Sequence, residues 1–253
     1  PGWSQIPEVG LALAAKAAKI NGVYSAMALL DLDTAKAKKY TDTKSVKEES
    51  GYTSPFCYPL WPCDRVGEYI LAKSAVAGAM IQYMVSDNED VPNQSPSNHL
   101  LGVGGQCLED GTEVYLDQDQ ANTVNGYGVT TAINQNGYRL WGNYTGAYPA
   151  SSDAKDIWFA VRRMFSWQGN NFIQTYFDEV DDPMNNVLVQ SVVDSENIRC
   201  SAYAPKYWAG ASIEYKSDDN PKTAILAGTM KLRQHIAPYT PAQEIVDIID
   251  YDT

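Results

Sequence analysis

Hydrophobic residues in the first quarter of the chain follow helical spacing first and strand-like runs afterwards. Residues 8–19 carry small and apolar side chains at helical spacing, and an Asn-Gly turn at 21–22 separates them from the apolar run 23–32, which predicts a buried strand. Residues 34–50 predict a second, solvated helix, and residues 55–62 predict a short strand bounded by prolines. Strand, helix and strand in this order favour a parallel strand pair.

The middle of the chain continues to alternate between helix and strand patterns. Residues 68–86 predict a buried helix, because apolar positions recur at helical spacing and small residues permit close packing. Residues 112–116 predict a short strand. Residues 129–141 contain two β-rich runs around Asn136 and Gly137, a pair that strongly indicates a hairpin turn.

The second half reads as helices followed by strands. Ser152 or Asp153 is a candidate cap for an aromatic-rich helix. Pro183, with acids before it, predicts the first turn of a helix through residue 203. Three strand-like runs follow, at residues 207–216, 223–237 and 244–252.

These patterns predict a mixed α+β fold with two parts. Residues 1–127 form an α/β domain portion, and residues 128–253 form an α+β domain with helices packed on a small sheet.

The net charge of the chain limits which classes of molecule it can bind. The net charge is −12, with about +3 on residues 1–47 and −15 on the rest, so nucleic-acid binding is not expected. The apolar run 10–30 is interrupted by Lys16, Lys19 and Asn21, which makes it too polar to span a membrane. The first residue is Pro1 and not Met, so a fragment that lacks an N-terminal segment is expected.

Candidate catalytic and metal-binding residues are sparse. Four cysteines form no CxxC pair and are expected to be reduced, and His99 and His235 stand alone, so no metal site is predicted from them. Asp31 and Asp33, at the end of a predicted strand, could hold Mg²⁺ or cap a helix. The metal reading gives an alternative function, a cytosolic metal-dependent α/β enzyme. An acidic adaptor that binds one partner without assembling is a third hypothesis.

Seven short segments, in chain order, resemble the tail sheath proteins of contractile phages. The segment "LWGNYT" at 140–145 is similar to a sheath motif in which Arg usually stands where this chain has Tyr144. The other segments are "PGW" at 1–3, "YPLW" at 58–61, "SPSN" at 95–98, "FAVRRMFSW" at 159–167, "DDPMNN" at 181–186 and "HIAPYTPAQEIVDIIDYD" at 235–252.

The resemblance implies a structural protein and no enzyme. Sheath subunits assemble as stacked hexameric rings around a tail tube, and the sheath contracts to drive the tube through a cell envelope. The implied partners are copies of the chain itself, the tail tube protein and baseplate components, with no nucleic acid, membrane, cofactor or metal. The implied location is the virion tail, assembled in the host bacterial cytoplasm.

The resemblance also implies which residues take part in assembly. Terminal arms of sheath subunits cross to neighbours and add strands to a C-terminal sheet, so the last run is a candidate arm; an ordinary edge strand within one subunit is the alternative. Asp247, Asp250 and Asp252 would discourage indiscriminate pairing of that run. Trp141 is expected to be a buried anchor, and Arg162 and Arg163 to pair with the acids at 178–182 or with a partner. The candidate assembly residues are Trp141, Tyr144, Arg162, Arg163, Glu244, Ile245, Ile248, Ile249 and Tyr251.

Overall fold

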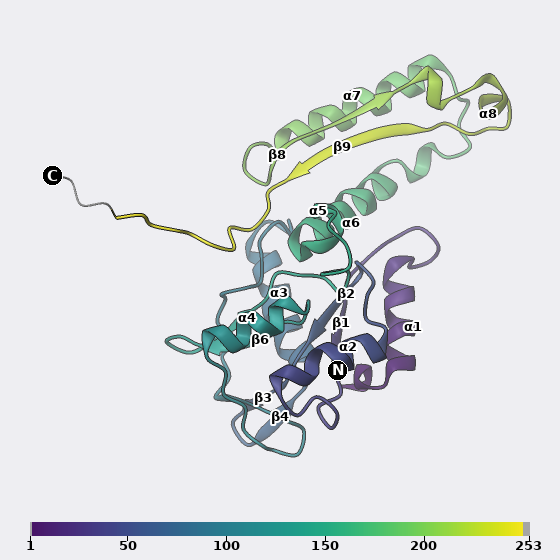
Figure 1. Cartoon of the computed structure of the whole chain (residues 1–253). Helices are drawn as coiled ribbons and strands as arrows, with labels where there is room; N and C mark the ends of the chain where they lie inside the picture. Colours follow the sequence, from purple (N-terminus) through teal and green to yellow (C-terminus); the bar gives the residue numbers. More distant parts are fainter. Residues whose placement is uncertain (1, 250–253) are drawn as a thin grey trace.

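Two parallel strands lie at the centre of the N-terminal body in the computed structural model, which describes residues 2–249 (Figure 1). β1 (Ala28–Asp31) and β2 (Cys57–Leu60) pair Ala28 with Cys57 and Asp31 with Leu60, which confirms the predicted parallel pair. Successive strand residues point to opposite faces. Leu30 therefore packs in a cluster with α1 (Pro7–Ala18) and α2 (Thr43–Ser50), whereas Tyr58 packs in a second cluster with α3 (Lys73–Asp87).

Short strands and one further helix complete the body. A three-stranded antiparallel sheet has the order β4-β3-β5, and β6 pairs with β7 as the predicted hairpin, with left-handed φ values of 54° at Asn136 and 104° at Gly137. The remaining elements of the body are η1 (Trp3–Gln5), η2 (Tyr40–Asp42), β3 (Cys63–Val66), β4 (Tyr69–Leu71), β5 (Gly105–Cys107), α4 (Gln118–Gly126), β6 (Thr131–Asn134) and β7 (Tyr138–Trp141).

Several predicted elements of the body are shorter or displaced. The strand predicted at 23–32 is limited to β1, and the helix predicted at 68–86 begins only at Lys73 because residues 69–71 form β4. The strand predicted at 112–116 is wrong: only an isolated bridge joins Glu113 to Cys107, and the strand lies at β5 instead.

The helix predicted at 34–50 begins at Thr43 and is not simply solvated. Lys47 is buried, and its ammonium donates to the carbonyl of Tyr127 at 2.9 Å and to that of Tyr148 at 2.5 Å. Burial lowers the pKa of Lys47 to about 8. A long side chain thus carries its charge inward to two carbonyl groups that would otherwise need other donors.

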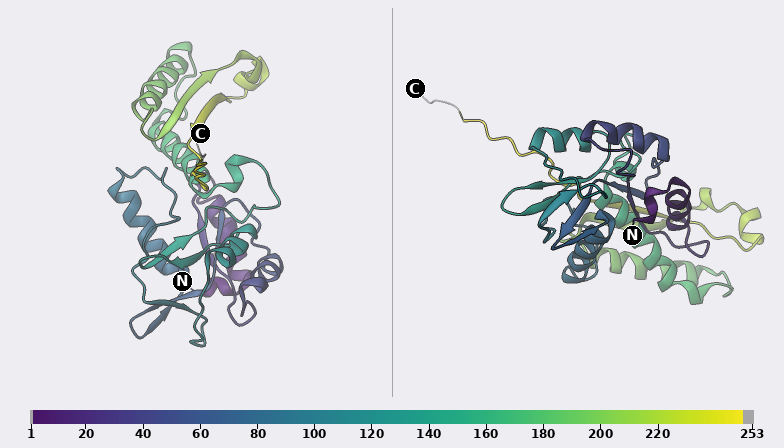
Figure 2. Two further views of the ribbon diagram at one scale, coloured as in Figure 1. Left: turned by 60° about the vertical axis from the view of Figure 1, so that its left-hand side comes forward. Right: turned by 90° about the horizontal axis from the view of Figure 1, so that it is seen from below.

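A C-terminal layer of helices and one β-hairpin lies above the body (Figures 1 and 2). Asp153 accepts from the amide of Lys155 and caps a four-residue helix at 154–157, but the aromatic-rich helix that it was expected to cap begins separately at Phe159 without a side-chain cap. The elements are α5 (Ala154–Ile157), α6 (Phe159–Thr175), η3 (Phe177–Glu179), α7 (Asn186–Ala202), β8 (Trp208–Tyr215), η4 (Ser217–Asp219), α8 (Lys222–Leu226) and β9 (Leu232–Pro238).

Two further predictions in this layer are wrong. Pro183 lies before α7, because Asn185 is the cap and its side chain accepts from the amide of Leu188 at 2.9 Å. The run 223–237 is not one strand, since α8 occupies its beginning and only β9 is extended.

The core crosses the boundary expected between residues 127 and 128. Ala132, Leu140 and Phe159 pack with Tyr58 and Leu60 in one cluster. A separate aromatic cluster of the C-terminal layer includes Val91 from the body, together with Met164, Cys200, Tyr207 and Trp208. The mixed α+β class is confirmed, and the division into two domains stays a prediction.

Candidate assembly site

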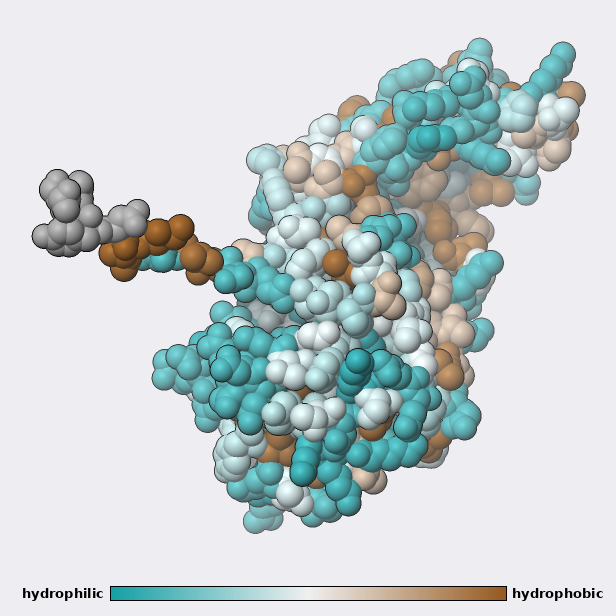
Figure 3. All heavy atoms as spheres, in the orientation of Figure 1, coloured by the Kyte–Doolittle hydropathy of each residue, from teal (hydrophilic) through white to brown (hydrophobic). Residues whose placement is uncertain are grey.

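The end of the described chain projects from the molecule with its apolar side chains uncovered (Figures 1 and 3). Residues 239–249 form neither helix nor strand, and Ile245 and Ile249 are 89% and 87% exposed. Ile248 and Val246 are also exposed, as is Glu244. The strand expected here has no partner strand among the described residues, and Tyr251 lies outside them.

The β8–β9 hairpin presents two unpaired strand edges. Its antiparallel register runs from Trp208 opposite Pro238 to Tyr215 opposite Leu232, and no other described strand pairs with it. A two-stranded sheet is marginal by itself, and unpaired edges are templates for a strand from another chain. The hairpin therefore offers the acceptor that a projecting apolar segment needs.

A groove opens beside the inner face of the hairpin. Its volume is about 710 Å³, and its apolar wall includes Phe172, Val192 and Leu232. Acidic residues at 179–182 lie at the same groove. Because residues of α6, α7 and β9 all line the groove, it exists only when the hairpin is held at a fixed distance from the helices.

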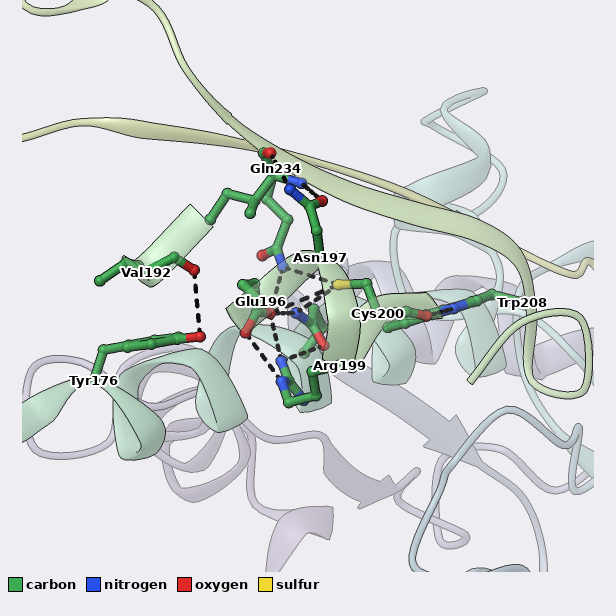
Figure 4. Close-up of polar contacts among 10 residues, drawn as sticks. Tyr176, Val192, Glu196, Asn197, Arg199, Cys200, Trp208 and Gln234 are labelled. Atoms are coloured by element: carbon green, nitrogen blue, oxygen red, sulfur yellow. Dashed lines mark hydrogen bonds and ion pairs between the residues drawn. The ribbon is translucent and has the colours of Figure 1, made fainter. Parts of the chain in front are cut away.

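A buried carboxylate provides that hold (Figure 4). Glu196 of α7 is completely buried and accepts from Gln168 of α6 at 2.5 Å and from Gln234 of β9 at 3.0 Å. Arg199 also donates to it, at 2.6 Å and 3.0 Å. Burial acts to raise the pKa of Glu196, but the hydrogen bonds and charge of Arg199 and the donation from Gln168 outweigh it and lower the pKa.

A second contact fixes the other strand of the hairpin. The amide side chain of Asn197 accepts from the backbone amide of Ile213 at 2.9 Å and donates to its carbonyl at 3.0 Å (Figure 4). No motif or spacing in the sequence singled out Glu196, Asn197 or Gln168 as functional residues. The i, i+3 spacing of Glu196 and Arg199 on one helix was the only local signal.

The "LWGNYT" segment lies at the junction of the body and the C-terminal layer. Trp141 is half-buried, so the expected buried anchor is wrong: its indole donates to Asn122 at 2.8 Å. Asn143 and Thr145 are buried, and Thr145 donates to the carbonyl of Asp156, which joins the segment to the start of the C-terminal layer. Tyr144 donates to Gln243 at 2.7 Å and so contacts the chain that leads to the projecting segment.

The two neighbouring arginines do not pair with the acids at 178–182. Arg162 forms an ion pair with Asp156 at 3.1 Å and lies over the ring of Phe56. Arg163 lies 5.3 Å from the ring centroid of Phe159, and burial lowers its pKa to about 10. Within residues 2–249 no carboxylate lies within 4 Å of Arg163, so pairing with a partner stays a prediction.

The two aspartates of the alternative enzyme hypothesis have structural partners. Asp31 accepts from the hydroxyl of Ser4 at 3.2 Å and from the amide of Ser74 at 2.8 Å, and Asp33 accepts from the amide of Ala35 at 2.8 Å. These contacts tie β1 to the start of α3 and close a turn. Among the described residues, no group of three His, Cys, Asp or Glu side chains is arranged to hold a metal ion.

The structure also shows the state of the cysteines, the contact of His235 and the hydropathy of the helices. Cys57, Cys63, Cys107 and Cys200 are free and buried, as expected for reduced cysteines. His235 contacts Glu214 at 3.0 Å. In the part of the chain that the structure describes, no helix has the length and hydropathy needed to cross a membrane.

The fold is similar to that of chains in solved contractile sheath and baseplate structures. Over 98% of this chain and 65% of the other, it is similar to a chain in the cryo-EM structure of the anti-feeding prophage (AFP) baseplate, with a TM-score of 0.75 and 20% identity. A chain of the AFP helical sheath in the contracted state is similar over 95% and 65%, with a TM-score of 0.73 and 19% identity. At these identities the structures show that the fold is shared.

The chain is also similar in sequence to two tail sheath proteins. The chain is 28% identical over 180 residues to the major tail sheath protein of Serratia phage KSP20, covering 69% of this chain and 44% of the relative. It is 24% identical over 149 residues to the tail sheath protein of Escherichia phage P2, covering 58% and 36%. No protein-family model matches the chain. The resemblance to contractile tail sheath proteins is confirmed, and the match spans less than half the length of either relative.

Proposed function

We propose that this chain is part of a structural subunit of a contractile tail sheath, in a phage tail or a related injection particle. The observation that carries the proposal is the projecting segment 244–249, whose large apolar side chains are exposed and uncovered by the rest of residues 2–249. Exposed apolar runs of this kind mark interaction sites. The sheath-like fold and the sheath relatives supply the context in which such a segment has a use.

The partner of the segment is a second copy of the chain. Residues 244–249 of one copy add as a strand to a free edge of the β8–β9 hairpin in the next, where backbone hydrogen bonds supply affinity and the apolar groove takes alternate side chains. When two different surfaces of the same protein bind each other, the contact repeats from one copy to the next. The copies then form an open helical array, or a closed ring where the rotation between copies brings the last one back to the first. Stacked hexameric rings around a tail tube follow this rule.

Contraction requires subunits that slide and stay joined. Strands contributed by a projecting segment keep their pairing while the bodies of neighbouring subunits exchange one set of contacts for another. Partners beyond the sheath itself are the tail tube protein and the baseplate, and the location is the tail of a virion or phage-like particle assembled in the host cytoplasm. No catalytic step belongs to this role.

The test compares apolar side chains inside and outside the segment. The double change Ile245→Asp and Ile249→Asp is expected to abolish polymers of the full-length gene product in electron microscopy, because carboxylates are costly to bury against the apolar wall of the groove and are repelled by its acidic residues at 179–182. Val187→Asp is the matched control, since Val187 is 78% exposed on α7 and outside the segment. Striated polymers formed equally by the double variant would contradict the proposal.

A further inference from the structure

The connection between β9 and the projecting segment is fixed at two points. The hydroxyl of Tyr239 donates to the carbonyl of Pro205 at 3.0 Å, which holds the connection to the C-terminal layer. The hydroxyl of Tyr144 donates to the side-chain oxygen of Gln243 at 2.7 Å, which holds it to the body. Residues 244–249 take part in none of the hydrogen bonds found among the described residues, so Gln243 is the last tethered point.

Tyr144 is a rigid support for that last contact. Its ring stacks on Tyr148 with centroids 3.8 Å apart and planes 7° apart, and on Trp158 at 4.9 Å and 27°. A backbone bridge also pairs Tyr144 with Trp158. The amide of the next residue, Thr145, donates to the carbonyl of Ile157 at 2.8 Å. With its ring held on two sides, the hydroxyl occupies one position relative to the body.

Gln243 is exposed, and among the described residues its side chain forms no hydrogen bond other than the one from Tyr144. Residues 239–243 line a cavity of about 570 Å³ together with Trp141, Asn122 and Asn143 of the body. Ile245 lies at the same cavity. A space therefore separates part of the connection from the body, and the hydrogen bond from Tyr144 crosses to it at Gln243. Beyond Gln243 the chain projects away from the body (Figure 1).

We propose that Tyr144 is a positioning residue that aims the C-terminal segment by holding Gln243. The inference rests on the proposed assembly function and adds a residue that controls it. In a free copy the hydrogen bond restricts the directions in which residues 244–249 leave the molecule, so less conformational freedom is lost when they pair with a second copy. Because one hydrogen bond has a modest net strength, assembly can break it and let the connection turn while the segment stays paired.

The test separates the hydroxyl from the ring. Tyr144→Phe keeps the aromatic stack and removes only the donor, and Gln243→Ala removes the acceptor at an exposed position that folding does not need. Tyr83→Phe is the matched control, because Tyr83 is 72% exposed on α3, away from this contact. Spin labels on Val246→Cys and Asp87→Cys, with the native cysteines buried, report the distance distribution from segment to body in the unassembled chain.

Tyr144→Phe and Gln243→Ala are each expected to broaden that distribution, the double variant to broaden it no further, and Tyr83→Phe to leave it unchanged. Polymerisation of the full-length product is expected to slow by about two- to tenfold in the two single variants, as the loss of one hydrogen bond permits. An unchanged distribution in Tyr144→Phe overturns the positioning role even if polymers form. If the variants broaden the distance distribution but the unaltered full-length product never polymerises, the positioning role is supported and the assembly function on which it rests is overturned.

Discussion

Gly142 shows at the scale of one residue why the "LWG" segment needs its glycine. A Cβ at this position would lie 2.4 Å from the hydroxyl oxygen of Thr130 and 2.9 Å from its Cα, and φ is +156°. The Gly142 amide donates to the hydroxyl of Ser97, and its carbonyl accepts from the hydroxyl of Tyr58. The backbone of one small residue thus joins β2, the β6–β7 hairpin and the "SPSN" turn.

Gly142→Ala is expected to lower the free energy of unfolding by about 1–3 kcal/mol, because the added methyl group overlaps the hydroxyl oxygen and the Cα of Thr130, and the Cα cannot move aside easily. Gly169→Ala in α6 is the matched control: no atom lies within 4 Å of its added Cβ, and replacing a helical glycine is expected to raise stability by about 0.5–1 kcal/mol. Denaturant titration measures both. Equal stability of the Gly142 variant and the unaltered chain would contradict the packing described here.

At the scale of elements, the acceptor hairpin depends on polar contacts as much as on apolar packing. Glu196 joins α6, α7 and β9, and Asn197 joins α7 to β8. Apolar contacts alone have no preferred register, whereas these hydrogen bonds have a donor, an acceptor and a direction. The free edges that the proposed function uses are therefore held at a defined place.

Glu196→Gln is expected to lower the free energy of unfolding at pH 7 by about 1–3 kcal/mol, because charged hydrogen bonds to Arg199 become neutral ones. The pKa of Glu196 is lowered in the folded state, so its contribution is complete above the ordinary value of 4.5 and is lost as pH falls through the lower folded value. The difference between the two proteins should therefore narrow in acid. Denaturant titrations from pH 7 to pH 3 test this.

Glu244→Gln provides the control for charge removal, since Glu244 is exposed and forms no hydrogen bond within residues 2–249. It should leave stability unchanged at pH 7. A gap between Glu196→Gln and the unaltered chain that stays constant down to pH 3 would show that the carboxylate charge has no part in holding the hairpin.

At the scale of the whole molecule, a few side chains join the body to the C-terminal layer. Asn170 of α6 accepts from the amide of Ser25 at 2.9 Å and donates to its carbonyl at 2.8 Å. Glu89, after α3, accepts from Lys206 and from the hydroxyl of Tyr207. Thr145 and Tyr144 add contacts to Asp156 and Gln243. Asn170 lies in the second half of α6, away from these contacts, and is expected to strengthen the coupling of the layer to the body there.

Asn170→Ala is expected to lower the free energy of unfolding by about 1–3 kcal/mol through the loss of two hydrogen bonds. Hydrogen exchange should show a larger loss of protection for amides of α7 than for those of β1, because the C-terminal layer opens first. Gln190→Ala is the control, since Gln190 bonds only to Asp194 on its own helix. An equal loss of protection in α7 and β1 would mean that the molecule unfolds as one unit.

The sequence by itself determined the features that depend on neighbours along the chain. Helical spacing located α1, and the Asn-Gly pair located the β6–β7 turn. The order of patterns also predicted the parallel β1–β2 pair and the mixed α+β class. Period and turn chemistry are written in consecutive residues, which is why these predictions succeed.

Only the tertiary structure decided which polar side chains lie inside and what they contact. Lys47 was expected in solvent and is buried, whereas Trp141 was expected to be buried and is half-exposed. The hydroxyl of Tyr144 meets a residue 99 positions away, and Gln234 reaches Glu196 across 38. No local pattern encodes such pairs, because the fold brings the partners together only after both elements are placed, and the energy gained depends on burial that the sequence does not display.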